Sequence, residues 1–280
     1  MKTPNSATNL GKALSRYCGK NKDDIRLARA MADVVVAQML PDGVVKGGCS
    51  LMFRYGGGVT RYTKDVDTAR VIDLERYLDA LRVKLSDGWN GFTGKLTDVE
   101  PPSPPNVPKP YVMMPFDIKL QYLGRPWMTV RIEIGHNEIG DADAFESSLP
   151  EDIADVFIAL GFPRPAAIPV MKLSYQVAQK LHAVSSKNSD RAHDLIDLQL
   201  MDAHSTLDLA DIRSKCERLF DYRREQAWPP ELVKGAIWDK VYDEARSTLR
   251  DATTILPDVD AAIQWANALI ARIAEAKVEL

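Results

Sequence analysis

The hydrophobic positions near the start of the chain recur at the spacing of an amphipathic helix. Intervals of three and four residues predict helix over residues 5–40, and they are marked by Leu27, Met31, Val34, Val35 and Met39. The sequence Leu-Pro-Asp-Gly at 40–43 predicts the end of this helix, because proline and glycine both interrupt helical structure. A shorter helix is predicted over residues 50–55, and three consecutive glycines at 56–58 follow it.

Runs of hydrophobic residues predict strands in the middle of the chain. Residues 59–66 alternate loosely, and two stronger strands are expected over residues 112–123 and 127–134, joined by a Gly-Arg-Pro hairpin turn. An amphipathic helix is expected over residues 74–85. The prolines at 101–105 predict an extended surface loop between these elements.

The pattern changes beyond residue 162. Prolines between 162 and 169 mark a joint, after which apolar residues recur at helical spacing almost to the end. We expect helices over residues 172–184, 190–203, 208–222, 230–249 and 258–277. The predicted fold class is therefore α+β, with an α+β N-terminal lobe, residues 1–165, and a helical C-terminal lobe, residues 166–280.

Two aspartates at the end of the first predicted strand are the leading candidates for chemistry. Residues two apart on a strand point to the same face, so Asp65 and Asp67 present two carboxylates to one place. Magnesium prefers oxygen ligands and usually completes its shell with water and substrate phosphates. The pair therefore predicts a magnesium site.

A pair of glycines precedes this strand at a predicted strand-to-helix turn. Gly47 and Gly48 allow the backbone to approach a triphosphate closely, and the helix that follows would point its first N–H groups at the phosphates. Ser50 adds a hydroxyl, and Arg61 adds a positive charge that suits a phosphate. These residues are the predicted nucleotide-binding set.

The acidic pair has low specificity when taken alone. With 39 acidic residues among 280, roughly five pairs at this spacing arise by chance. The ordinary alternative is a polar strand face, with Asp67 or Thr68 capping the next helix. Gly-Gly-x-Ser at a turn, followed by the acidic pair on the next strand, is a much rarer combination and favours the catalytic interpretation.

These motifs resemble the AbiEii family of type IV toxin nucleotidyltransferases, a DNA polymerase β-like group that includes the mycobacterial MenT toxins. The matching segments are Lys-Gly-Gly-Cys-Ser at 46–50, Arg-Tyr-Thr-Lys-Asp-Val-Asp at 61–67, Arg-Ile-Glu-Ile at 131–134, Gln-Lys-Leu-His-Ala at 179–183 and Arg-Ala-His-Asp-Leu-Ile-Asp-Leu at 191–198. Each motif is weak by itself, but their common order is specific. The resemblance implies a nucleotidyltransferase-like mixed sheet flanked by helices.

The resemblance includes an acidic residue on a later strand, and Glu133 matches it. Val130, Ile132 and Ile134 fall on one face of the predicted strand, which leaves Arg131 and Glu133 together on the other. Glu133 would then complete a site of three carboxylates with the earlier aspartates. An exposed face on which these charges form salt bridges is the alternative.

The resemblance also assigns roles in the helical lobe. Lys180 borders the apolar face of its predicted helix, a position that also suits an ordinary surface lysine. In the family, the matching lysine contacts the triphosphate and the aspartate matching Asp194 supports it, while Asp197 is expected to be structural. The family often has lysine before that first aspartate, whereas this chain has His193, so the local charge differs. Thr63 matches a residue whose phosphorylation silences MenT relatives.

The activity implied by the resemblance is transfer of nucleotides from a nucleoside triphosphate, with Mg²⁺, to the 3′ acceptor end of tRNA. This would block translation, and a cognate antitoxin is the expected partner. Basic residues of the helical lobe would track phosphates, although a solvated helix face is their commoner role: Arg213, Lys215, Arg218, Arg223, Arg224 and Lys234. Two alternatives stay open, a nucleotidyltransferase acting on a protein or small molecule and a catalytically silent interaction protein.

Composition changes this picture little. Hydrophobic residues at 45% and charged residues at 27% are ordinary for a globular protein, and the net charge of −3 gives no global attraction to nucleic acid. The three cysteines have no C-x-x-C spacing, so neither a disulfide framework nor a zinc site is expected. Because no segment resembles a signal peptide or a membrane span, we expect a cytoplasmic, monomeric protein without membrane contact.

Overall fold

The computed structural model of the chain describes residues 2–19, 24–101 and 112–277. Its contacts divide the chain into two compact units: the first is Met1–Gly57 with Thr63–Val170, and the second is Gly58–Tyr62 with Met171–Leu280. The predicted lobes, 1–165 and 166–280, stay a prediction. Apart from Pro101, the predicted proline-rich loop at 101–105 lies outside the described residues.

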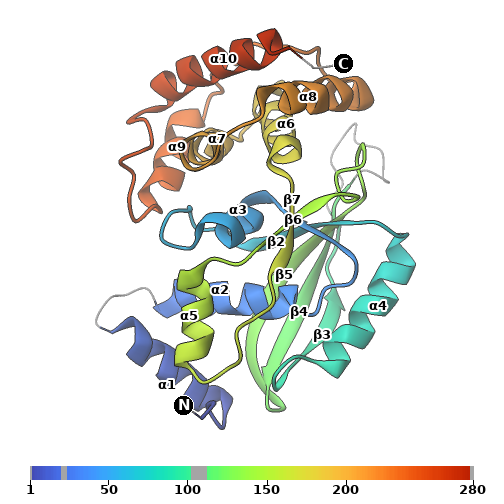
Figure 1. Cartoon of the computed structure of the whole chain (residues 1–280), viewed down its shortest axis with the longest axis vertical. Coiled ribbons are helices and arrows are strands. Elements are labelled where there is room, and N and C mark those ends of the chain that lie inside the picture. The colour runs from blue at the N-terminus through green and yellow to red at the C-terminus, as the bar shows by residue number, and fades with distance from the viewer. Residues whose placement is uncertain (1, 20–23, 102–111, 278–280) are drawn as a thin grey trace. The chain divides into compact units, whose positions relative to one another are not determined.

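A mixed seven-stranded sheet forms the first unit (Figure 1), as the fold class predicted. The strands are β1 (Gly43–Lys46), β2 (Asp65–Arg70), β3 (Phe92–Asp98), β4 (Met114–Tyr122), β5 (Arg125–Gly135), β6 (Phe145–Ser148) and β7 (Ile168–Met171). Their order is β3-β4-β5-β2-β1-β7-β6. Strand β1 runs antiparallel to β2 and parallel to β7, whereas β2 runs parallel to β5.

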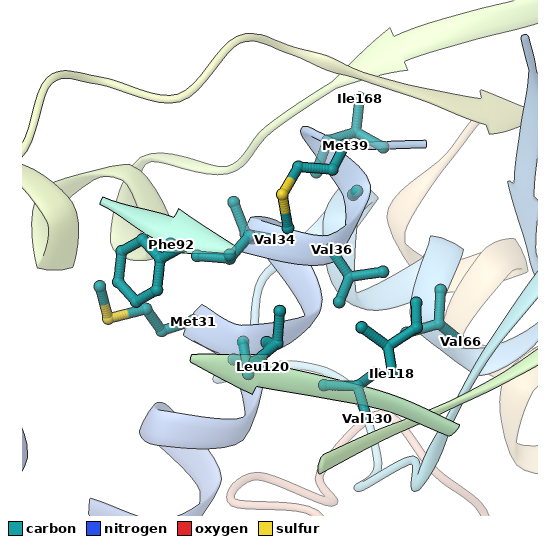
Figure 2. Packing of buried hydrophobic residues seen from close by; sticks show 14 of the residues in the cluster. Met31, Val34, Val36, Met39, Val66, Phe92, Ile118, Leu120, Val130 and Ile168 are labelled. Atoms are coloured by element: carbon teal, nitrogen blue, oxygen red, sulfur yellow. The ribbon is translucent and has the colours of Figure 1, made fainter. Parts of the chain in front are cut away.

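Helices of the same unit cover the apolar face of this sheet. They are α1 (Ala7–Cys18), α2 (Asp24–Ala37), α3 (Gly47–Tyr55), α4 (Leu74–Asp87) and α5 (Glu151–Ala159). Figure 2 shows side chains of α2 packed beside those of β4 and β5, namely Met31, Val34 and Val36 with Ile118, Leu120 and Val130. Burial of this apolar surface is the main driving force for the unit.

The strand predicted over residues 59–66 is wrong. Strand β2 begins only at Asp65, and residues 61–64 have no regular secondary structure. The reason is tertiary: residues 58–62 pack within the second unit, where the Arg61 side chain bonds to Asp197. Asp65 and Asp67 nevertheless share one strand, and the spacing argument for their common face holds.

Other predicted boundaries differ by smaller amounts. The helix predicted over 5–40 is two helices, α1 and α2. The helix predicted over 50–55 begins earlier, at Gly47, and β1, β3, β6, β7 and α5 were not predicted as separate elements. The helix predicted over 230–249 starts only at Trp238, and residues 231–235 have no regular secondary structure.

The second unit is helical, as predicted. Its helices are α6 (Leu173–Ser185), α7 (His193–His204), α8 (Leu209–Arg223), α9 (Trp238–Ser247) and α10 (Val259–Glu275). Asp208 begins α8 by accepting a hydrogen bond from the Asp211 amide, and Asp258 caps α10 in the same way through the Ala261 amide. These caps explain why the predicted helix starts at 208 and 258 lie within one residue of the observed ones.

The cysteines are distributed over both units. Cys49 in the first unit and Cys216 in the second are fully buried, whereas Cys18 is half-buried. Burial raises the pKa of both the Cys49 and the Cys216 thiols. Among the described residues, no helix has the length and apolar character needed to span a bilayer.

Candidate active site

The polar face of the sheet carries three of the predicted carboxylates. Asp67 on β2 is the direct neighbour of Glu133 on β5, and Asp65 is the neighbour of Arg131 two residues earlier along the same two strands. Neighbouring strands lie about 4.8 Å apart, so side chains at paired positions on one face can reach a common ligand. Asp65, Asp67 and Glu133 therefore occupy adjacent positions on one face, and their role as metal ligands stays a prediction.

The glycine turn lies directly against Asp67. Gly47 has a positive φ of +64°, and a Cβ at this position would lie 2.1 Å from Asp67 Oδ2. Only glycine fits here, for both conformational and steric reasons. Gly48 is buried in the first turn of α3, and Ser50 donates a hydrogen bond of 3.0 Å from its hydroxyl to the Gly47 carbonyl. The predicted glycines and serine thus build one turn beside a predicted metal-binding acid.

The chemistry of these residues fits a divalent cation, although the side chains are not closed around one. Among the described residues, no three His, Cys, Asp or Glu side chains are grouped tightly enough to hold a metal ion. Three carboxylates at adjacent positions nevertheless provide the oxygen donors that Mg²⁺ prefers. Asp65, Asp67 and Glu133 are the residues that would hold the cation, since their backbone spacing permits a common ligand.

Lys46 is a charged neighbour of these carboxylates, and the sequence predicted no role for it. It is the last residue of β1, it pairs with Asp67, and it is only 8% exposed. Its ammonium extends towards Gly135 on β5, where a Cβ would lie 3.1 Å from Nζ. A lysine next to a glycine pair was visible in the sequence, but its place beside Asp67 depends on the strand register.

A second group of predicted residues forms a buried ion-pair cluster within the second unit. Lys180 on α6 donates to Asp194 Oδ1 at 2.7 Å and to Asp197 Oδ2 at 2.6 Å, and both carboxylates belong to α7. Arg191 bonds to the other oxygen of Asp194 at 2.6 Å. The Lys180 side chain is 7% exposed, so it is not the surface lysine of the alternative interpretation.

Arg61 joins the same cluster. Its Nε and Nη2 atoms donate to the two oxygens of Asp197, each at 2.8 Å, and this forked geometry is the strongest arrangement for an arginine and a carboxylate. Arg61 was predicted to bind nucleotide, and Asp197 to be structural. In the structure these two residues form an ion pair, in which the Arg61 guanidinium is directed at the Asp197 carboxylate.

The charges of this cluster do not cancel. Burial alone would raise the pKa of Asp194 and of Asp197, but the adjacent cations outweigh it and hold both pKa values below their ordinary range. Burial lowers the pKa of His193 to about 4, so this imidazole is neutral at pH 7. Three cations, Lys180, Arg61 and Arg191, against two carboxylates leave a net charge of +1.

In the sequence, Thr63 lies between Arg61, which belongs to the Lys180 cluster, and Asp65, a predicted metal ligand. It belongs to the first unit and is half-buried, two positions before Asp65. Two residues of α2 were not predicted from the sequence: Arg29, which donates to the Lys64 carbonyl just before Asp65, and Asp33, its ion-pair partner. No local sequence signal marks this contact, because it joins residues 35 positions apart.

Carboxylates beside a glycine turn, on a mixed sheet with a helical unit following, are the features of a nucleotidyltransferase. The family model described as nucleotidyl transferase AbiEii toxin, type IV TA system, matches residues 27–265, and the chain belongs to this family. The resemblance identified from the sequence motifs is thereby confirmed.

The fold is also similar to solved structures. One is MenT4, a nucleotidyltransferase toxin from Mycobacterium tuberculosis H37Rv, at 17% identity and a TM-score of 0.56 over 95% of this chain and 90% of that chain. Another is JHP933 from Helicobacter pylori, at 16% identity and a TM-score of 0.44 over 91% and 93% of the two chains. A search of curated protein sequences finds no match.

Proposed function

We propose that this toxin-family protein transfers nucleotides from a nucleoside triphosphate to the 3′ acceptor end of tRNA, using Mg²⁺ held by Asp65, Asp67 and Glu133. The observation that carries the proposal is the pairing of Asp67 with Glu133, two residues along the strand from Asp65 and against the Gly47 turn. A bound cation would supply Lewis-acid stabilisation of the charge that develops on the transferred phosphoryl group.

The residues of the chain would contribute mainly by position and charge. The Gly47 turn allows close approach of a phosphate, and the first amides of α3, whose N-cap residue Lys46 makes no side-chain capping bond, would favour an anion. The family resemblance assigns contact with the triphosphate to Lys180, and the cluster around this lysine has a net charge of +1 within the second unit. Asp194 and Asp197 hold the Lys180 ammonium through hydrogen bonds of 2.7 and 2.6 Å.

Support for tRNA as the acceptor comes from the family and not from the charged surface. Of the basic residues expected to follow phosphates, three are already paired with acids: Arg213 with Glu217, Lys215 with Asp211, and Lys234 with Asp239 and Asp260. Such pairs leave less net positive charge for a nucleic acid. The acceptor is therefore the part of the proposal that most needs a direct assay.

Control by an antitoxin is proposed for the same reason of family membership. Phosphorylation of Thr63 would add nearly two negative charges two residues from Asp65 and would repel a triphosphate. Intact-mass analysis after co-expression with a cognate antitoxin checks this. An antitoxin that silences the enzyme while Thr63 keeps its unmodified mass would show that control works by binding.

The decisive experiment incubates the purified protein with each labelled triphosphate and with separate pools of tRNA, protein and small molecules. We expect label in tRNA, with a loss of at least 100-fold in Asp65→Asn and Asp67→Asn because the carboxylates stabilise the transition state. Asp98→Asn, an exposed acid on β3, is the matched control and should keep full activity.

The other outcomes separate the alternatives. Label confined to the protein or small-molecule pool would show that the protein is a nucleotidyltransferase whose acceptor is not tRNA. Absence of transfer to every pool, with toxicity unchanged in Asp65→Asn, would favour a catalytically silent interaction protein.

A further inference from the structure

Arg29 and Asp33 of α2 form an ion pair that reaches the metal-binding strand. Arg29 Nε donates to Asp33 Oδ1 at 2.8 Å, one helical turn away. The Nη2 atom of the same guanidinium donates to the backbone carbonyl of Lys64. One side chain therefore links α2 to the peptide group that immediately precedes Asp65, the first residue of β2.

The start of β2 is paired with a neighbouring strand on one side only. Strand β1 pairs with β2 only from Arg70 back to Asp67, because the chain leaves β1 at Lys46 to begin α3. In the pairing of these strands, Asp65 therefore has a partner in β5 but none in β1. Arg29 supplies a contact at this point from outside the sheet.

This ion pair is costly to bury, which argues against a role in stability alone. Asp33 is 1% exposed, and the Arg29 side chain is 14% exposed. Burial raises the pKa of Asp33 to about 7 even though Arg29 opposes the shift, and Asp65 raises it further. Buried ion pairs often contribute no more stability than apolar residues of the same volume. The directed contact with Lys64 is what apolar residues would not provide.

We propose that Arg29, held by Asp33, is a positioning residue that fixes the start of β2 and so orients Asp65 towards the position of the cation. This inference rests on the proposed function, because it assumes that Asp65 binds metal. Arg29 acts through the Lys64 peptide group and not by contact with substrate. Residues that orient metal ligands from outside the coordination sphere typically alter metal affinity by 10- to 100-fold when replaced.

The test compares wild-type protein with Arg29→Met, which keeps most of the side-chain length but loses all donors. Mn²⁺ affinity is measured by titration calorimetry, and hydrogen exchange is measured for the peptide containing residues 63–67. We expect Mn²⁺ binding to weaken about tenfold. We also expect exchange at residues 63–67 of the metal-free protein to accelerate, because the Lys64 peptide loses its anchor.

The chain offers a control with the same pattern of bonds at a more exposed position. Arg213 on α8 pairs with Glu217 one turn away at 2.7 Å, and its Nη1 atom donates to the backbone carbonyl of Ala276 at 2.9 Å. Arg213→Met therefore removes an ion pair and a backbone contact from the second unit without leaving a buried acid unpaired. It should leave both Mn²⁺ affinity and exchange at residues 63–67 unchanged.

Each outcome decides between the inference and the function on which it rests. If wild-type protein binds Mn²⁺ and Arg29→Met matches it in both affinity and exchange, the inference is wrong and the proposed function stands. If wild-type protein binds no Mn²⁺, the metal site fails, and unchanged exchange in Arg29→Met would reject the anchoring role as well. Should Arg29→Met not fold, Arg29→Lys replaces it, since one ammonium cannot reproduce the fork and intermediate values are expected.

Discussion

Gly47 combines two constraints that are usually found apart. Its φ of +64° is a conformation that side chains disfavour, and the space beyond its Cα is occupied by the Asp67 carboxylate. The backbone constraint alone makes glycine the preferred residue, as at many turns. The contact with Asp67 adds a functional reason, because any side chain at this position must displace a predicted metal ligand.

A comparison of two glycines separates these effects. Gly47→Ala and Gly19→Ala should each cost roughly 1 kcal/mol of stability, since both have φ near +65° and both are strained by a Cβ. Gly19 has no described atom within 4 Å of that Cβ. Transfer activity should therefore fall at least tenfold in Gly47→Ala only, as measured in the labelled-triphosphate assay. Equal activity in the two variants would show that Asp67 moves aside without loss.

The roles of Arg29 and Lys46 show the limit of prediction from single residues. Asp65, Asp67 and the glycine pair were found because their motif is local in sequence. Lys46 becomes a neighbour of Asp67 only through the pairing of β1 with β2, and Arg29 reaches Lys64 across 35 positions. Neither contact has a signature in the sequence, because both depend on how the elements pack.

At the scale of elements, long helices with regular apolar positions were predicted from the sequence, whereas very short strands were not. Helices α6, α8 and α10 span 13 to 17 residues with regular apolar positions, and their predicted ends lie within two residues of the observed ones. Strands β1, β6 and β7 have four residues each, too few for an alternating pattern to be distinguished from chance. The predicted strand at 59–66 failed because a tertiary contact overrode a weak local pattern.

Helix α7 begins with a histidine whose charge depends on pH. The pKa of His193 is lowered from 6.5 to about 4, first by burial, so the folded state favours the neutral imidazole. The contribution of the neutral imidazole to the free energy of unfolding is therefore present at pH 7, and it is lost as the pH falls from about 6.5 towards 4. Between pH 7 and pH 4.5, wild-type protein should lose roughly 2–3 kcal/mol more than His193→Gln, as measured by urea denaturation. Parallel losses would contradict a lowered pKa.

At the scale of the whole chain, the second unit is not continuous in sequence. Residues 58–62 belong to it although they precede β2, and they contribute Arg61 to Asp197 and the Tyr62 amide to the Thr248 hydroxyl at 3.2 Å. A cut at the predicted joint between residues 165 and 166 would separate these contacts from the helices they stabilise.

Because the second unit includes residues 58–62, we expect a C-terminal fragment without them to be less stable than the full chain. We also expect a peptide that contains them to restore stability. Residues 171–280 expressed alone should melt at a lower temperature than the full chain, because Asp197 keeps Lys180 but loses its forked pair with Arg61. A synthetic peptide of residues 56–64 should raise the melting temperature in proportion to its concentration. The same peptide with Arg61→Met should not. A fragment indifferent to both peptides would show that the segment contributes nothing.

The positions of the cysteines provide a natural reporter for each unit. Cys49 and Cys216 are fully buried, one in the first unit and one in the second, and burial raises the pKa of each thiol. Because a thiol reagent reacts with the thiolate, alkylation at either site requires local opening. Labelling kinetics resolved by peptide mass would follow the opening of the two units separately in unmodified protein. Half-buried Cys18 would serve as the fast internal standard.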